Sequence, residues 1–187
     1  MRQWNNQSDE ELMNAAQANQ PGAFEALYTR YRIRLYNFIC RFIGDAGLAE
    51  DIFQETFLRA YRERRRYEPR AAISTWLYTI ARNLCLHEID KRPRRQSGSG
   101  SPGDVLTATA SPTDDPLAQL EAAHTAARVA RAVALLPPAE REVLILARYE
   151  GLPHSQIAVI LGKSEGAVRA ALYRALAALR GRLQEGR

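Results

Sequence analysis

Residues 155–176 have the sequence SQIAVILGKSEGAVRAALYRAL, which decides how the C-terminal part of the chain folds. Apolar residues recur at three- and four-residue steps on both sides of Gly162, and this spacing indicates two short amphipathic helices. Gly162 suits the turn between them, because such a turn often needs a positive φ angle. The residues expected to point inward are Ile157, Ala158, Leu161, Val168, Leu172, Ala175 and Leu179. Together they predict a helix-turn-helix.

The opposite face of the second helix is expected to face solvent. It presents Gly166, Arg169, Ala170, Tyr173 and Arg174. Such a helix can enter the major groove of DNA, where arginine reaches phosphates or guanine. An ordinary helical hairpin is the alternative, but the spacing of small residue, glycine and apolar residues favours DNA binding.

Two more helices are expected before this motif. A helix begins after the N-cap Asp115 and the helix-starting proline Pro116, and it continues to about Leu135. Two prolines at 137 and 138 interrupt it, and a second helix follows over residues 139–149 and stops at Gly151. The short first helix of the helix-turn-helix covers residues 155–161, and its second helix covers residues 165–183.

Residues 96–115, QSGSGSPGDVLTATASPTDD, have a different composition from their flanks. They contain three glycines, two prolines, no aromatic residue and no basic residue. Such a segment cannot bury enough apolar surface to offset the entropy of ordering it, so we expect a flexible linker. Residues 105–110 could form a weak strand, but no partner strand is evident.

The first half is also expected to be helical. Ser8 and Glu11 have capping-box spacing, which predicts a helix to about Ala18. Pro21 suits the first position of a second helix that ends at Gly44. Apolar periodicity predicts a third helix over residues 48–61 and a fourth over residues 73–84 that ends before Pro93. Twelve of the fifteen aromatic residues fall within residues 24–78, so this half is expected to hold the bulkier core.

The predicted fold class is therefore all-α, with two small helical domains joined by a flexible linker. We place the first domain at residues 1–95, the linker at 96–115 and the second domain, which contains the helix-turn-helix, at 116–187. The chain has 187 residues and a formal net charge of +5. A modest positive excess permits nucleic-acid binding without proving it. No apolar run is long enough to span a membrane, and residues 1–11 do not indicate a signal peptide.

Enzymatic activity is not expected. His87, His124 and His154 are scattered, and no glycine-rich phosphate loop or paired acid–base site is evident. Cys40 and Cys85 form neither a disulfide framework nor a zinc constellation, so we expect buried thiols and a reducing cytoplasm. No metal or other cofactor is expected.

Two basic segments lie near aromatic residues in the first half. Residues 62–70, RERRRYEPR, hold five arginines, and residues 91–95, KRPRR, add further cations around a proline. Cations with nearby aromatics suit single-stranded nucleic acid, because every base offers a face for stacking. The alternative is a solvated helix end with Trp76 as an ordinary core residue.

Taken together, the two halves resemble bacterial sigma factors of the extracytoplasmic-function (ECF) group, which have only the second and fourth sigma domains. The resemblance rests on AFEALYTRYRIRLYNF (23–38), LAEDIFQETFLRAYR (48–62), STWLYTIARNLCLHEIDKRPRR (74–95) and residues 136–179. It covers nearly the whole chain outside the linker and the extreme ends.

The resemblance implies roles for three groups of residues. In this family the helix matching 48–62 docks on core RNA polymerase, which here points to Asp51, Gln54 and Glu55, with Arg59 nearby. The segment matching 67–83 captures the separated non-template strand of the −10 element, with Tyr67, Ser74, Trp76, Arg82 and Asn83 as candidates. The helix-turn-helix matches the reader of −35 duplex DNA, with Lys163, Ser164, Arg169, Tyr173 and Arg174 as candidates.

Two departures from the family pattern bear on these roles. The loop at residues 68–72 differs from the glycine-containing sequence common in relatives, which affects the identity of the captured base. Ala171 and Leu176 stand where relatives often carry arginine, and fewer cations predict a smaller salt dependence, by roughly 0.9 log units per lost phosphate contact.

The resemblance also predicts partners. It implies binding to core RNA polymerase and promoter DNA and, commonly in relatives, to an inhibitory anti-sigma factor. A monomer is expected for the free chain, because no heptad seam is present. The competing interpretation is a free-standing helix-turn-helix regulator that binds duplex DNA without polymerase, which leaves the basic and aromatic first half unexplained.

Overall fold

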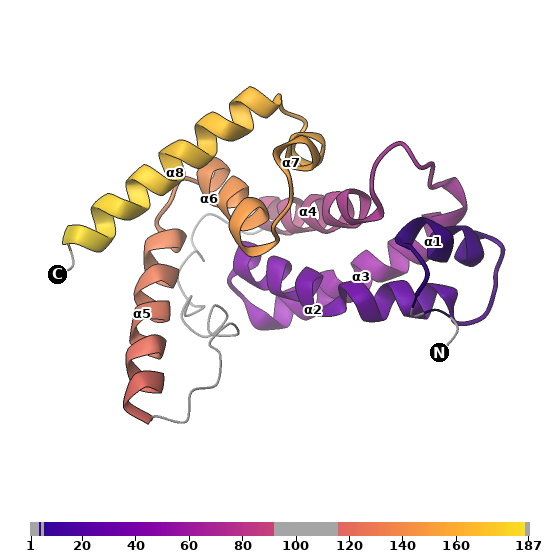
Figure 1. The fold of residues 1–187 in the computed structure, drawn as a ribbon, viewed down its shortest axis with the longest axis horizontal. Helices are drawn as coiled ribbons and strands as arrows, with labels where there is room; N and C mark the ends of the chain where they lie inside the picture. The colour runs from indigo at the N-terminus through magenta and orange to yellow at the C-terminus, as the bar shows by residue number, and fades with distance from the viewer. Residues whose placement is uncertain (1–3, 5, 92–115, 186–187) are drawn as a thin grey trace.

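The computed structural model describes residue 4, residues 6–91 and residues 116–185, and these residues form helices in two groups (Figure 1). The N-terminal group contains α1 (Asp9–Gln17), α2 (Ala23–Ile43), α3 (Ala46–Glu63), the 3₁₀ turn η2 (Arg64–Arg66) and α4 (Ile73–Lys91). The C-terminal group contains α5 (Pro116–Ala134), α6 (Pro138–Leu144), the π-helical turn η3 (Ile145–Tyr149), α7 (His154–Leu161) and α8 (Glu165–Glu185). No strand occurs in the described residues, which confirms the predicted all-α class. The expected spacer, with its weak strand, lies outside them.

The N-terminal group packs α2, α3 and α4 side by side, with α1 against the start of α2 (Figure 1). Its core is built from large side chains that the helical periodicity brings to one face. Phe38 and Tyr78 are fully buried, and their rings meet edge to face at 5.1 Å between centroids. Phe53 and Phe57 form a similar pair at 5.2 Å on α3. Aromatic packing therefore dominates this half, as the sequence predicted.

Several helix boundaries follow the predicted capping residues. Ser8 accepts a hydrogen bond from the backbone N–H of Glu11, and the Glu11 carboxylate accepts from the backbone of Ser8. Gly44 ends α2 in the left-handed conformation with a φ of 71°, and Gly162 ends α7 with a φ of 61°. Both glycines supply a conformation that a side chain would strain.

Two boundary predictions were wrong. Pro21 does not begin α2, because Gly22 adopts the left-handed conformation (φ 82°) and the helix starts only at Ala23. The carbonyl of Pro21 instead accepts a hydrogen bond from the indole of Trp4 at 3.2 Å. The helix predicted over residues 139–149 is also not uniform, since its second half is the π-helical turn η3.

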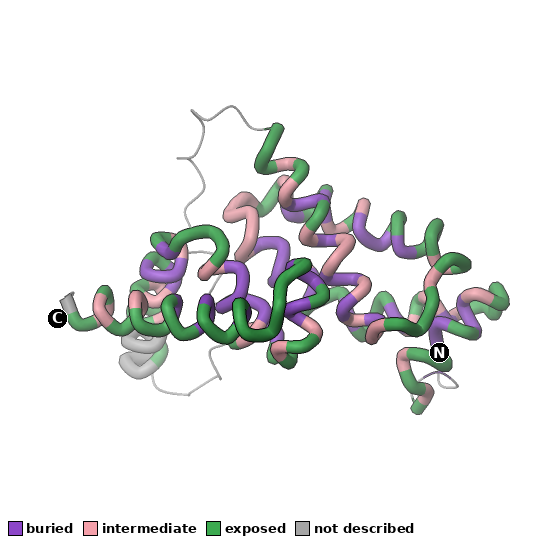
Figure 2. The backbone as a smooth tube through the Cα atoms, turned by 90° about the horizontal axis from the view of Figure 1, so that it is seen from above, coloured by how far each residue is buried: buried purple, intermediate pink, exposed green. Residues whose placement is uncertain are grey.

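The two groups are packed against each other. Helix α4 contacts α7, and α2 contacts η3, so the C-terminal helices α6 and α7 lie along one side of α4 (Figure 1). One cluster of buried apolar side chains continues through both groups. Buried stretches in Figure 2 lie where helices face one another, and the outer faces are exposed.

Candidate nucleic-acid and polymerase interfaces

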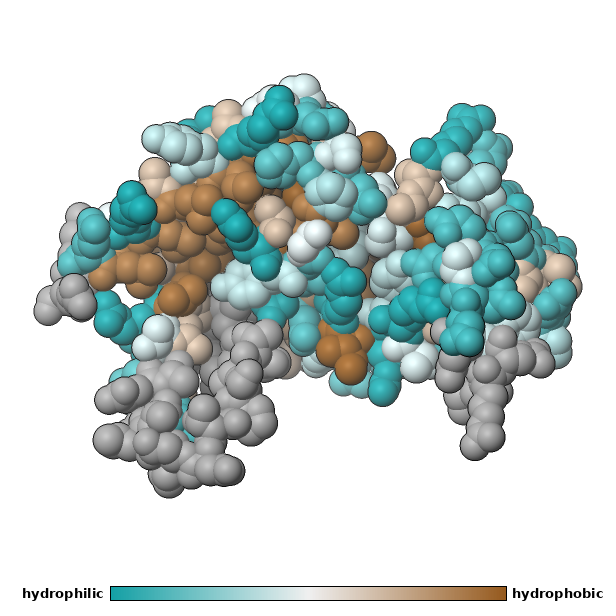
Figure 3. Space-filling view, viewed as in Figure 1, coloured by the Kyte–Doolittle hydropathy of each residue, from teal (hydrophilic) through white to brown (hydrophobic). Residues whose placement is uncertain are grey.

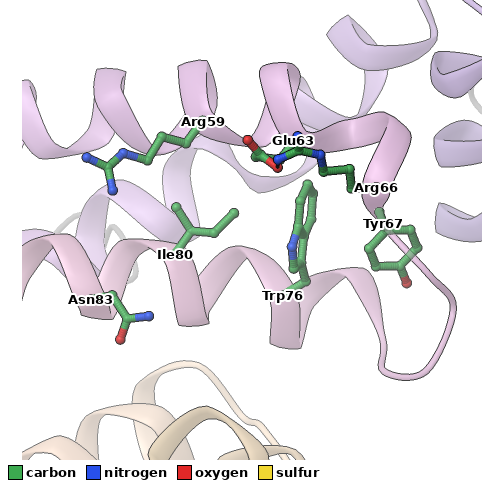
Figure 4. A pocket seen from close by; sticks show the side chains of 7 residues that line it. All are labelled: Arg59, Glu63, Arg66, Tyr67, Trp76, Ile80 and Asn83. Atoms are coloured by element: carbon green, nitrogen blue, oxygen red, sulfur yellow. Dashed lines mark hydrogen bonds and ion pairs between the residues drawn. The ribbon is translucent and has the colours of Figure 1, made fainter.

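A pocket of about 240 Å³ lies between α3, η2 and α4 (Figure 4). Its lining combines cations with aromatic, apolar and amide side chains: Arg59, Glu63, Arg66, Tyr67, Trp76, Ile80 and Asn83. The volume is below the roughly 300–1,000 Å³ of pockets that enclose drug-sized ligands. A pocket of this size and lining suits one flat, polar-edged ring rather than an extended ligand.

The aromatic wall of this pocket is fixed by contacts on both sides. The rings of Tyr67 and Trp76 lie 5.1 Å apart between centroids. The Tyr67 hydroxyl donates to the carbonyl of Ala71 at 2.6 Å, which closes the loop between η2 and α4. Burial raises the pKa of the Tyr67 hydroxyl above its ordinary value, so it stays a neutral donor.

Helix α1 braces the turn that carries Tyr67. The side-chain amide of Gln17 donates to the carbonyls of Arg64 and Tyr67, both at 2.9 Å. The guanidinium of Arg64 donates back to the carbonyl of Ala16 at 3.1 Å and to the side chain of Asn19 at 2.7 Å. These bonds join residues more than forty positions apart, so no local pattern pointed to Gln17 as part of this region.

The predicted −10 residues fall into two sets. Tyr67, Trp76 and Asn83 line the pocket together. Ser74 and Arg82 point from the other side of α4 toward the C-terminal group, where Ser74 is 3.5 Å from the side chain of Gln156. Arg82 forms an ion pair with Glu142. The structure therefore does not bring all five candidates into one site.

Arg59 was predicted beside the polymerase-docking residues, and the structure places it at the pocket as well. Its guanidinium is 2.6 Å from the carboxylate of Glu55, one turn earlier on α3. Sequence reasoning did not single out Glu63, Arg66 or Ile80 as pocket residues. Arg66 lies in the basic segment 62–70, so the charge of this segment indicated the region but not which of its arginines lines the pocket.

The polar docking face of α3 lies on the surface as expected. Asp51 and Gln54 are exposed, and Glu55 is half-buried. Exposed apolar side chains border this face: Tyr28, Leu58 and Tyr61 are 38%, 49% and 48% exposed. The sequence had suggested only the polar residues of this face as contacts for polymerase.

The helix-turn-helix is confirmed in its geometry. Six of the seven residues predicted to point inward are buried, and Leu179 is partly buried. The residues predicted on the outer face of α8 are all exposed, and Tyr173 is 76% exposed. Arg174 is held by Glu140 at 2.9 Å, whereas Arg169 forms no ion pair with another of the described residues.

Two details of the helix-turn-helix refine the expectations. Ser164 accepts a hydrogen bond from the backbone N–H of Ala167 at 3.2 Å, so its hydroxyl helps to cap α8. Lys163 stands exposed beside it. Ala171 is only 4% exposed, so this position lies on the buried side of α8 and not on the exposed face with Arg169 and Tyr173. Leu176 is 37% exposed.

The boundary between the two groups holds buried charge. Four polar residues are buried in the described part of the chain: Thr56, Thr75, Glu142 and Glu150. Burial raises the pKa of the Glu150 carboxyl, and the Tyr78 hydroxyl, Arg41 and Arg34 act in the opposite direction. Both buried carboxylates contact residues of the N-terminal group.

No set of three His, Cys, Asp or Glu side chains within the described ranges could hold a metal ion. In the same ranges, no helix has the length and apolar character that crossing a bilayer requires.

Comparisons with known proteins agree with this architecture. The sigma-70 region 2 family model matches residues 27–95, and the sigma-70 region 4 model matches residues 126–179. The RNA polymerase sigma-H factor of Pseudomonas aeruginosa is 32% identical, with 95% of each chain covered. The ECF sigma factor SigL of Mycobacterium tuberculosis is 34% identical, covering 92% of this chain and 96% of SigL.

Solved structures show the same fold at lower identity. CnrH, in complex with the cytosolic domain of CnrY, has a TM-score of 0.71 at 23% identity and covers 96% of this chain and 99% of its own. RpoE from Bartonella quintana, in complex with the anti-sigma factor NepR, has a TM-score of 0.66 at 21% identity, with coverage of 89% and 99%.

The paired family matches and the helix-turn-helix define a transcription initiation factor of the sigma-70 class. The chain belongs to the ECF sigma factors of that family. As a sigma factor it acts with core RNA polymerase to start transcription at specific promoters. The N-terminal group is sigma region 2 and the C-terminal group is sigma region 4, and we call them domain 2 and domain 4.

Proposed function

We propose that the pocket between α3, η2 and α4 receives one unpaired base of the non-template strand at the −10 element. The observation that carries this proposal is the lining of the pocket, where Tyr67 and Trp76 form a wall flanked by Arg59 and Arg66. Stacking on an aromatic side chain contributes about 1–3 kcal/mol per base, and it offsets the few kcal/mol needed to extrude a base. Asn83 supplies an amide that can donate to and accept from the edge of the base.

Ser74 and Arg82 serve the same strand from the other side of α4. Arg82 carries a charge suited to a phosphate, and Ser74 stands at the first turn of the helix. The two residues are covered by domain 4 in this structure, so they become available to DNA only when domain 4 moves away.

Domain 4 is proposed to read the −35 duplex through α8. The exposed face with Arg169, Tyr173 and Arg174 enters the major groove, and Lys163 and Ser164 at the helix start lie toward the phosphates. Arg174 would exchange its partner Glu140 for DNA.

Core polymerase is proposed to dock on the outer face of α3 through Asp51, Gln54 and Glu55, with Arg59 at the edge nearest the pocket. The exposed apolar side chains Leu58 and Tyr61 extend this surface. A rim of charge around apolar side chains is typical of protein–protein interfaces. Figure 3 shows a second apolar surface over α5, α6 and α8, and this surface is a second candidate protein contact. Leu135, the residue directly after α5, is 67% exposed.

An anti-sigma factor is the proposed inhibitory partner, because the fold is shared with the sigma factor RpoE, which was solved in complex with the anti-sigma factor NepR. The free chain is proposed to be monomeric and to work in the cytoplasm, where polymerase and promoter DNA are found. Polymerase performs the chemistry of RNA synthesis, so no catalytic residue is assigned to this chain.

Reconstituted transcription tests the proposal. The purified chain and bacterial core polymerase are incubated with a promoter library, and the RNA starts are sequenced. We expect starts that depend on the chain and share two spaced upstream motifs. The Asn83→Leu variant should retain polymerase binding but lose promoter opening by about tenfold, measured by permanganate reactivity of unpaired thymines.

The matched control is Asn14→Leu, which makes the same change at an exposed position of α1. It should open promoters as the parent does. Equal opening by Asn83→Leu and the parent would refute the pocket assignment. Specific duplex binding without polymerase, together with no chain-dependent starts, would instead support a free-standing regulator.

A further inference from the structure

The side of α4 opposite the pocket is covered by two carboxylates of domain 4. The Tyr78 hydroxyl donates to Glu150 at 2.5 Å, and a guanidinium nitrogen of Arg41 lies 3.4 Å from the other carboxylate oxygen. Arg34 donates to the backbone carbonyl of Glu150. The Glu150 side chain is only 1% exposed, so these contacts replace the water that a carboxylate would otherwise bind.

Glu142 forms the second contact, one helix earlier. Its carboxylate pairs with Arg82, with the second nitrogen–oxygen distance at 3.4 Å. The two side chains are 18% and 9% exposed. A bidentate ion pair of this kind fixes the orientation of the guanidinium as well as its position.

The partners of Glu150 indicate that this docking is encoded in the sequence. In the part of the chain that the structure describes, the side-chain partners recorded for its carboxylate come from α2 and α4 of domain 2. Arg41 also lies over the ring of Tyr149, 4.5 Å from its centroid. A carboxylate buried without such partners would be strongly unfavourable, so domain 2 supplies what domain 4 needs to bury Glu150.

We propose that Glu142 and Glu150, with the domain 2 side chains that they hold, form a carboxylate latch that docks domain 4 on domain 2. The latch occupies Arg82 and covers Ser74, so docking by domain 4 and capture of the −10 strand exclude each other. The free chain is thereby self-inhibited without any partner. This inference rests on the proposed role of Arg82 and Ser74 in promoter recognition.

The latch can be measured on the full chain by energy transfer between one dye on each domain. Glu25→Cys on α2 and Arg180→Cys on α8 provide exposed attachment sites, whereas the native Cys40 and Cys85 are buried. In this labelled background, Glu142→Arg places like charges opposite each other, and Glu150→Gln removes the buried charge while preserving shape. Glu88→Gln is the control, because it neutralises a carboxylate that pairs with Lys91, three residues later on the same helix α4.

We expect both latch variants to lower the transfer efficiency and the control to match the parent. We also expect Glu142→Arg to reach half-maximal transcription at a concentration up to about tenfold lower, because apparent affinity scales with the fraction of competent chain. Circular dichroism verifies folding, and the isosteric Glu150→Gln variant decides the test if Glu142→Arg does not fold.

Unchanged transfer efficiency in the folded variants would overturn the latch. Lower efficiency with an unchanged half-maximal concentration would overturn the self-inhibition. An absence of chain-dependent transcripts from every variant, with the drop in efficiency intact, would overturn the proposed function and still support the docking itself.

Discussion

Arg82 and Glu142 stand sixty residues apart in sequence and form an ion pair between domains 2 and 4. The contact distinguishes two sides of α4. Trp76 and Asn83 face the open pocket, whereas Arg82 and Ser74 face domain 4. One helix therefore lines a pocket on one side and contacts domain 4 on the other.

Charge reversal on α3 is expected to weaken polymerase binding. Asp51→Lys and Glu55→Lys together change the surface charge by four units without touching the pocket aromatics. Repulsion at an interface of opposite charge lowers the association rate most strongly, so the affinity should fall by about tenfold or more at low salt. Binding of the labelled chain to core polymerase measures this.

Asp90→Lys provides the control for charge reversal, since Asp90 is exposed near the end of α4. Unchanged polymerase binding by the α3 double variant would mean that another surface docks on polymerase.

Gln17→Leu is expected to impair promoter opening although Gln17 does not line the proposed base pocket. The change removes two hydrogen bonds that hold the carbonyls of Arg64 and Tyr67, at about 1 kcal/mol each. The Tyr67 wall should then become mobile. Permanganate reactivity should fall while polymerase affinity stays unchanged. Gln17→Glu should reduce promoter opening as much as Gln17→Leu, because a carboxylate cannot donate hydrogen bonds to the two carbonyls.

The exposed Gln20 offers a matched control, because Gln20→Leu makes the same change three residues later. An equal loss of promoter opening in Gln20→Leu would show that the effect does not depend on the two hydrogen bonds of Gln17.

Local features of this fold were predictable from the sequence. The capping box at Ser8 and Glu11 and the left-handed Gly162 depend on residues a few positions apart, and the structure confirms both. The outer face of α8 followed from helical periodicity alone. Such features are set by backbone chemistry within one or two turns, and tertiary contacts do not alter them.

Features that depend on distant partners were not predictable. The start of α2 shifted from Pro21 to Ala23, where Gly22 adopts a positive φ beside the indole of Trp4. The latch joins Glu150 to Tyr78, and periodicity cannot show which surface a buried carboxylate meets. The division of α4 into two sides became visible only with the domain packing.

Arg169→Ala is expected to weaken duplex binding by domain 4 and to reduce its salt dependence. Arg169 is exposed on the outer face of α8. Loss of one phosphate contact should lower the slope of log affinity against log salt by about 0.9, whereas loss of a base contact should relax sequence preference at one position. Fluorescence anisotropy with −35 duplexes at several salt concentrations distinguishes the two.

Arg180→Ala is the comparison for Arg169→Ala, because Arg180 is exposed on α8 beyond the helix-turn-helix. It should leave both slope and preference unchanged. Equal slopes for Arg169→Ala and the parent, with equal preference, would remove Arg169 from the DNA surface.

The two native thiols are expected to resist alkylation in the folded chain. Cys40 and Cys85 are 2% and 0% exposed. Burial raises the pKa of the Cys85 thiol to about 12 and raises the pKa of Cys40 above its ordinary value. Because the thiolate is the reactive form, little of either residue can react near pH 8.

Iodoacetamide labelling followed by mass spectrometry measures this protection. At pH 8 Cys85 should react more than about 100-fold more slowly than a thiol with the ordinary pKa near 8.5, and Cys40 should also react more slowly than such a thiol. Glu25→Cys supplies such an exposed thiol within the same molecule, and denaturant should make all three react alike. Rapid labelling of Cys85 in the native chain would show that α4 separates readily from its neighbours, contrary to its fully buried position in the core.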